Sequence, residues 1–199
     1  MVARRCCVLL AMACTLAHAA QAPVAQAAVA PPHIAQAVPH ARLAGSGTYT
    51  FFTLKVYLAE LWVGEQGYVA GEPFALDLRY ARALKGKKIA EASVEQMAKI
   101  GAGSADQRQA WLQKMTAIFP DVREGSHISG IYLPDVGAHF YLDGQLLARI
   151  DDRDFARAFF GIWLDPATTA PALRQALLED AGPRQVAPRD AAPRAVRQR

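Results

Sequence analysis

Cysteine is scarce in this 199-residue sequence: Cys6, Cys7 and Cys14 are its three thiols, and all of them precede residue 15. The rest of the chain has no thiol, which excludes disulfide bonds, thiolate metal sites and a cysteine nucleophile from its body. The body must therefore be stabilised by a packed core. The full sequence has 52% hydrophobic and 20% charged residues, a composition typical of a globular protein. About 140 residues are enough to bury roughly two-thirds of the unfolded surface.

Long apolar runs are also missing. The run at residues 6–16 has about eleven residues, whereas a membrane-spanning helix needs about 20. Because it follows Arg4 and Arg5 and precedes small-residue cleavage options at 17–19 and 25–27, it is typical of an export signal. We expect a signal peptide over residues 1–19, a periplasmic or secreted location after cleavage, and no transmembrane segment in the mature protein. A lipid-modified Cys14 is the alternative, and N-terminal sequencing distinguishes the two.

A positively charged body is the third absence. The chain has 22 Lys and Arg against 18 Asp and Glu, but seven of the cations are arginines near the termini, with only Asp190 against them. The central body is therefore slightly acidic, which excludes a basic nucleic-acid-binding domain. The composition predicts a flexible lead rich in alanine and proline over residues 20–41, one folded domain over 42–180, and a disordered basic tail over 181–199.

Motifs for catalysis and cofactor binding are few. There is no Gly-x-Ser-x-Gly elbow, and Gly45-Ser46-Gly47 precedes a strand instead of joining a strand to a helix, so it does not fit a phosphate-binding loop. His127 and His139 lack a carboxylate at ligand spacing along the sequence, and we interpret them as strand residues instead of metal ligands. We expect no metal and no cofactor.

The apolar periodicity predicts strands, then helices, then strands, then helices. Residues 50–63 and 74–80 alternate as strands do, and residues 128–150 have strand character with a hairpin turn at Asp143-Gly144. Helical spacing follows residue 88, and Ser104 with Gln107 forms a capping-box signature for a second helix. Helical stripes recur at 155–163, after a cap at Asp152, and at 168–177. This order favours an α+β fold with an antiparallel sheet.

Two features of the predicted strands suggest a binding site. Alternation puts Phe52, Leu54 and Val56 on one apolar face, which we expect to look into the core. Tyr80 points to the apolar side of the next strand, where its hydroxyl needs a partner, either a structural group or a ligand. Strand alternation turns Arg79 the opposite way from Tyr80.

Several ordered segments together carry a family resemblance. They are Gly45-Ser46-Gly47, the stretch 52–62, Trp111 through Phe119-Pro120, the segment 139–144, the stretch 155–166, and 171–174. Over residues 42–180 the chain resembles the bacterial chalcone isomerase-like family, exported relatives of plant chalcone isomerase and of plastid fatty-acid-binding proteins. The resemblance implies an open-faced β-sandwich, in which a long antiparallel sheet has helices packed on one face and a ligand cleft between them.

The resemblance does not carry the plant enzyme's chemistry with it. The positions matching its arginine, threonine and tyrosine hold Tyr49, Phe52 and Ile89, and its lysine falls near Arg79 or Tyr80. Loss of one donor to a developing oxyanion can cost about 10²-fold in rate. The arginine that clamps a carboxylate in the fatty-acid binders is missing from the same place.

These observations favour a non-catalytic exported protein that binds an apolar or amphipathic small molecule, such as a fatty acid. The candidate cleft residues are Tyr49, Phe52, Leu54, Val56, Arg79, Tyr80 and Ile89. The alternatives are an intramolecular lyase or isomerase with an unknown substrate, and a partner-binding protein with a filled core. The sequence names neither the ligand nor the oligomeric state.

Overall fold

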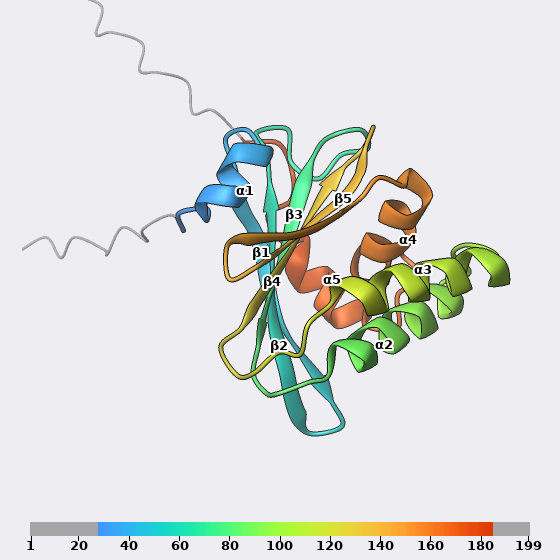
Figure 1. The fold of residues 1–199 in the computed structure, drawn as a ribbon. Helices are drawn as coiled ribbons and strands as arrows, with labels where there is room; N and C mark the ends of the chain where they lie inside the picture. Colours follow the sequence, from blue (N-terminus) through green and yellow to red (C-terminus); the bar gives the residue numbers. More distant parts are fainter. Residues whose placement is uncertain (1–27, 185–199) are drawn as a thin grey trace, which may run out of the picture.

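A six-stranded antiparallel sheet forms the frame of the protein, in a computed structural model that describes residues 28–184. The strands lie side by side in sequence order (Figure 1). They are β1 (Arg42–Phe51), β2 (Leu54–Val63), β3 (Phe74–Tyr80), β4 (His127–Leu133), β5 (Gly137–Leu142) and β6 (Gln145–Ile150). The sheet confirms the predicted α+β class and the open-faced architecture.

Four helices cover one face of this sheet (Figure 1). They are α2 (Gly86–Lys99), α3 (Ala105–Ile118), α4 (Arg153–Leu164) and α5 (Pro171–Leu177). The predicted capping box begins α3, where Ser104 and Gln107 exchange hydrogen bonds of 2.8 and 3.1 Å, and the Asp152 carboxylate caps α4. The Asp143-Gly144 turn joins β5 to β6 with positive φ at both residues, as a tight hairpin requires.

The main core lies between the sheet and these helices. The alternation predicted for residues 74–80 is confirmed, because Phe74, Leu76, Leu78 and Tyr80 of β3 all point into this core. Gly45 of β1 allows α5 to approach closely, since a Cβ at this position would lie 2.1 Å from the carbonyl oxygen of Ala176. The Gly45-Ser46-Gly47 segment therefore serves helix packing.

A β-bulge in β2 reverses the faces that strict alternation predicts. The register passes from the pair Tyr49 and Tyr57 directly to Thr50 and Lys55, so Val56 is an extra residue. Tyr57, instead of the even-numbered residues around it, then faces the helices. Phe52 lies in the two-residue turn between β1 and β2, with a φ of 53°, and its side chain is 89% exposed. The expectation that Phe52 looks into the core is therefore wrong.

The opposite face of the sheet carries a short helix, α1 (Pro32–Ala37), within the segment predicted to be a flexible lead. Ile34 and Val38 are fully buried there against Trp62, Ala75 and Ile131. Composition alone predicts flexibility because alanine and proline dominate this segment, yet two branched apolar residues four positions apart are enough to dock one helical turn. The structure thus corrects the predicted boundary: the packed part of the chain extends to α1.

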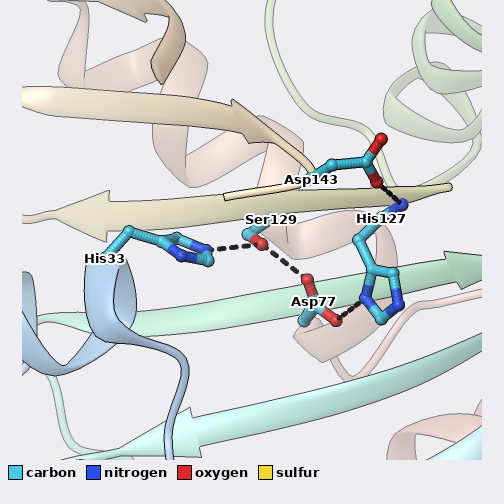
Figure 2. Close-up of polar contacts among 5 residues, drawn as sticks. All are labelled: His33, Asp77, His127, Ser129 and Asp143. Atoms are coloured by element: carbon cyan, nitrogen blue, oxygen red, sulfur yellow. Dashed lines mark hydrogen bonds and ion pairs between the residues drawn. The ribbon is translucent and has the colours of Figure 1, made fainter. Parts of the chain in front are cut away.

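A buried polar network lies next to α1 (Figure 2). The Asp77 carboxylate is 4% exposed and accepts a hydrogen bond of 2.5 Å from the Ser129 hydroxyl, while its second oxygen lies 2.8 Å from Nδ1 of His127. Nε2 of His33, on α1, lies 2.8 Å from the same Ser129 oxygen. Because Ser129 gives its proton to Asp77, His33 must be the donor to Ser129. The network therefore ties α1 to β3 and β4.

The C-terminal segment returns to the sheet before the described chain ends. The backbone N–H of Tyr68 donates to the carbonyl of Ala181, and that of Arg184 donates to Glu65. The first residues of the predicted tail are therefore held by backbone hydrogen bonds to the segment between β2 and β3. The predicted signal peptide and the rest of the tail lie outside the described residues.

Replacing Ile34 by alanine tests the docking of α1. We expect the free energy of unfolding to fall by about 2–4 kcal/mol, because the substitution leaves a cavity between α1 and the sheet. Gln36→Ala, on an exposed position of the same helix, is the matched control and should change stability by less than about 0.5 kcal/mol. Chemical denaturation of both variants measures the difference; equal midpoints would contradict the docking.

The His33 contact predicts that stability falls in mild acid. Burial, opposed in part by Asp77, holds the pKa of His33 below its ordinary value of 6.5. The native state therefore takes up this proton less readily than the unfolded chain. Stability should fall as the pH drops below about 6.5 and level off below the native pKa.

Thermal unfolding of His33→Gln is the comparison, because glutamine can donate to Ser129 without titrating. We expect the variant to lose less stability than the wild type between about pH 7 and pH 5. An unchanged pH dependence would assign the effect to other groups.

Candidate functional site: an apolar pocket beneath helix α2

A cavity of about 440 Å³ lies between α2 and the strands β1 to β3, within the size range of small-molecule sites. Strand residues form its floor, α2 forms one wall, and residues of α4 and the α4–α5 connection close its inner end. The residues that line it are Tyr49, Phe51, Val56, Tyr57, Leu78, Tyr80, Arg82, Leu84, Lys88, Ile89, Ala92, Ser93, Glu95, Gln96, Lys99, Phe119, Ile128, Phe159, Ile162, Trp163, Thr169 and Ala170.

Three tyrosines from three neighbouring strands form the floor. Tyr49 and Tyr57 face each other across the β1–β2 pair with ring centroids 5.1 Å apart, and Tyr80 meets Tyr57 edge-on at 6.0 Å. Residues paired across an antiparallel ladder point to the same face of the sheet, which explains why all three lie together. The floor is therefore aromatic, with hydroxyl groups as its polar atoms.

The hydroxyl of Tyr80 has no hydrogen-bond partner among residues 28–184, although its side chain is only 4% exposed. The Tyr57 hydroxyl accepts a bond of 2.9 Å from Nε1–H of Trp163, so its own proton remains available. Burial raises the pKa of both tyrosines above the ordinary value of 10, so both stay neutral at physiological pH. The pocket thus offers uncharged donors to an acceptor oxygen.

Charge is confined to the mouth of the pocket. Its charged lining residues, Arg82, Lys88, Glu95 and Lys99, are all solvent-exposed. Lys99 pairs with Glu95 at 2.7 Å, and Lys88 pairs with the neighbouring Glu91 at 2.8 Å. Arg82 has no ion-pair or hydrogen-bond partner within the described part of the chain. The interior can therefore bury an apolar group of a ligand, and the mouth can bind a negatively charged group.

Four of the seven candidate residues line this pocket: Tyr49, Val56, Tyr80 and Ile89. Leu54 shares the helix-covered face with its pair Phe51, but it is 52% exposed and lies beyond the pocket, near the turn that contains Phe52. Arg79 pairs with Leu58 and His127, is exposed, and lies on the opposite face of the sheet from Tyr80. The structure therefore corrects the candidate set at Phe52, Leu54 and Arg79. The ligand-binding role of the other four stays a prediction.

Several lining residues escaped the sequence analysis. Strict alternation with Phe52, Leu54 and Val56 puts Tyr57 on the opposite face, because the bulge at Val56 has no sequence signature. Phe159 and Trp163 were recognised as a helical apolar stripe, which is the signal of a core helix and does not distinguish a core residue from a pocket residue. Only the packing of α4 against the sheet shows which residues of that stripe line the cavity.

The polar network beneath α1 contains Ser, His and Asp side chains, but its geometry does not suit nucleophilic catalysis (Figure 2). Ser129 is 1% exposed, and its proton is directed to Asp77 instead of a histidine base. The carboxylate beside His127, at 2.8 Å, comes from 50 positions away in the chain, so no spacing rule could have found it. Within the described residues, no group of three or more His, Cys, Asp or Glu could hold a metal ion.

A second, larger depression of about 610 Å³ lies over Phe74, Tyr132 and Phe160. Both arginines in its lining have partners: Arg153 donates to the carbonyl of Asp135 at 3.0 Å, and Arg157 pairs with Asp154. Within the described residues it therefore lacks an unpaired cation such as Arg82 at the mouth of the pocket beneath α2.

No helix within residues 28–184 is long and apolar enough to cross a membrane. This finding concerns the described helices alone.

Comparison with known proteins gives relatives in sequence and in fold. An uncharacterized protein of Haemophilus influenzae is 33% identical over 135 residues, which span 67% of this chain and 66%, just under two thirds, of that protein. The crystal structure of an Arabidopsis thaliana fatty-acid binding protein matches with a TM-score of 0.59 at 13% identity, over 73% of this chain and 91% of that one. At this identity the likeness shows the fold alone. A model of the chalcone isomerase-like family matches residues 25–179. This chain therefore belongs to the chalcone isomerase-like family.

Proposed function

We propose that the protein binds an amphipathic carboxylic acid, such as a fatty acid, in the pocket beneath α2, and that it does so without catalysing a reaction. The observation that carries the proposal is an uncharged, aromatic interior that opens at a mouth bearing an unpaired arginine. Transfer of a hydrocarbon chain from water to such an interior is favourable by about 0.8 kcal/mol per buried CH₂. The fatty-acid-binding structural neighbour supports the same class of ligand.

The carboxylate belongs at the mouth, because no cation accompanies it inside. Burying an unpaired carboxylate costs several kcal/mol, and the neutral hydroxyls of Tyr57 and Tyr80 offset only part of that cost. Arg82 supplies a positive charge only two residues beyond Tyr80, and both line the cavity. We assign the carboxylate to Arg82 and Tyr80, and the alkyl chain to the apolar lining around Leu78, Phe119 and Ile162.

Export is part of the proposal. The arginine pair and the short apolar run near the N-terminus support it, and they lie outside the described residues.

Narrowing the pocket should weaken binding. Ala92 lines the cavity from an exposed position of α2, and a tryptophan there narrows its mouth. We expect Ala92→Trp to raise the dissociation constant for a long-chain fatty acid at least about tenfold, because the alkyl chain loses part of its buried contacts. Ala98→Trp, on the same helix but outside the pocket, is the matched control and should bind as the wild type does. Displacement of a fluorescent fatty acid measures both.

The same assay tests the position of the carboxylate. Arg82→Gln and Tyr80→Phe should each weaken fatty-acid binding several-fold and leave binding of the corresponding fatty alcohol less affected, because charge and one donor are removed. If Ala92→Trp and Ala98→Trp bind equally well, the ligand does not occupy this pocket and the proposal fails.

The alternative function, an intramolecular lyase of chalcone isomerase type, requires donors that stabilise negative charge on a ketone oxygen. The pocket interior has only neutral phenols for this, Ile89 donates nothing, and Arg79 lies on the far face of the sheet. We expect the purified protein not to accelerate cyclisation of a hydroxychalcone above the spontaneous rate. Progress curves with and without protein measure it. An enhancement of about a thousandfold that Tyr80→Phe abolishes would reverse the assignment.

A further inference from the structure

The turn between β1 and β2 exposes an apolar cluster beside the mouth of the pocket. Phe51, Phe52 and Leu54 are 58%, 89% and 52% exposed, and the rings of Phe51 and Phe52 touch edge-on at 4.7 Å. Figure 1 shows this hairpin extending past the other strands at the bottom of the view. Large apolar side chains that cluster at one exposed point mark interaction sites, whereas scattered ones do not.

Phe52 also has an unfavourable backbone conformation. Its φ of 53° lies in the left-handed region, which glycine and asparagine adopt readily and bulky residues rarely do. The strain presents an aromatic ring to solvent, and the only aromatic ring in contact with it among the described residues is that of Phe51. Packing within the chain therefore does not explain why phenylalanine occupies this position.

The charge around this cluster is mainly positive. Residues 49–57 contain Lys55 and no carboxylate, and residues 81–90 contain Arg82, Lys85, Lys87 and Lys88 and no carboxylate. Glu91 and Asp121 pair with three of these lysines, which leaves a net positive surface at the mouth. Phe51, Arg82 and Lys88 all line the pocket, so the apolar cluster and the cations surround one opening.

We propose that this hairpin turn, Phe51 to Leu54, inserts into the headgroup region of an anionic lipid bilayer, with the cations at the start of α2 against the lipid phosphates. Apolar side chains flanked by lysine and arginine are the combination that binds membrane surfaces. Each cation near an anionic surface strengthens binding about fivefold. Docking in this orientation turns the pocket mouth toward the bilayer. The proposal goes beyond ligand binding and does not depend on which molecule occupies the pocket.

Sedimentation with lipid vesicles tests the proposal without any added fatty acid, so its failure is separable from failure of the proposed function. We expect the protein to bind vesicles of phosphatidylglycerol and phosphatidylcholine, and to bind vesicles of phosphatidylcholine alone about tenfold or more weakly. High salt should weaken binding to the anionic vesicles.

Two pairs of variants assign the contact to the hairpin turn. Phe52→Asn should weaken binding to anionic vesicles about tenfold while its melting temperature stays equal or rises, because asparagine tolerates this φ. Leu146→Asn is the matched control: Leu146 is 48% exposed in the β5–β6 hairpin, and this variant should bind as the wild type does. In Phe52→Trp the added indole should shift its emission to the blue on anionic vesicles, whereas Leu146→Trp should not.

The proposal is overturned if the wild type does not bind anionic vesicles, or if Phe52→Asn binds them as well as the wild type. The proposal is equally overturned if two results are found together. Sedimentation velocity without lipid shows a dimer that is absent in the Phe52→Asn variant, and added vesicles do not dissociate this dimer. The exposed turn would then be an interface between two copies of the chain.

Discussion

The packing of Phe159 between the sheet and the other helices is the interaction on which both the core and the pocket depend. Its ring meets Phe140 of β5 edge-on at 5.0 Å, and it lies 5.4 Å from Trp163 on its own helix. On this side the space between the layers is filled. Its other side borders the cavity, together with Ile162 and Trp163 of the same helix. Because close-packed aromatic rings resist compression, they fix the separation of sheet and helices on which the pocket depends.

The two faces of the sheet are covered in different ways, and this separates polar from apolar chemistry. The helix layer on one face buries almost only apolar groups. On the other face, the small cover of α1 lies over Asp77, a carboxylate that stays buried because a serine and a histidine satisfy it. The buried Asp77 carboxylate thus serves to hold α1 against the sheet through Ser129 and His33. What the pocket can do therefore rests on neutral hydroxyls and apolar surface.

Sequence periodicity predicted the elements that are regular and failed where one residue interrupts the pattern. The β3 strand, the capping box at Ser104 and the Asp143-Gly144 hairpin follow local rules, and all of them were confirmed. The bulge at Val56 inserts a single residue, so the positions between it and the turn point to the opposite faces from those that alternation along the rest of β2 gives. The bulge arises from the pairing of β1 with β2 and not from the local sequence. For the same reason Tyr57 is absent from the predicted cleft residues. The existence of a cleft could be predicted, but the full set of residues that line it could not. Helix α1 is too short to have a periodic signal, and it forms because the sheet offers an apolar surface for Ile34 and Val38.

A pocket built in this way is better suited to carriage than to cyclisation. Catalysis of an addition to an enone needs charge fixed in advance where the oxyanion develops, and fixed buried charge is costly unless the fold compensates it. Here the buried polar atoms are phenols whose ionisation is suppressed by burial, and the cations are at the surface, where water screens them. An alkyl chain requires none of that charge. It needs only a dry, preformed cavity and a mouth where its polar end stays hydrated, so the features that weaken the catalytic interpretation are the ones that allow reversible binding.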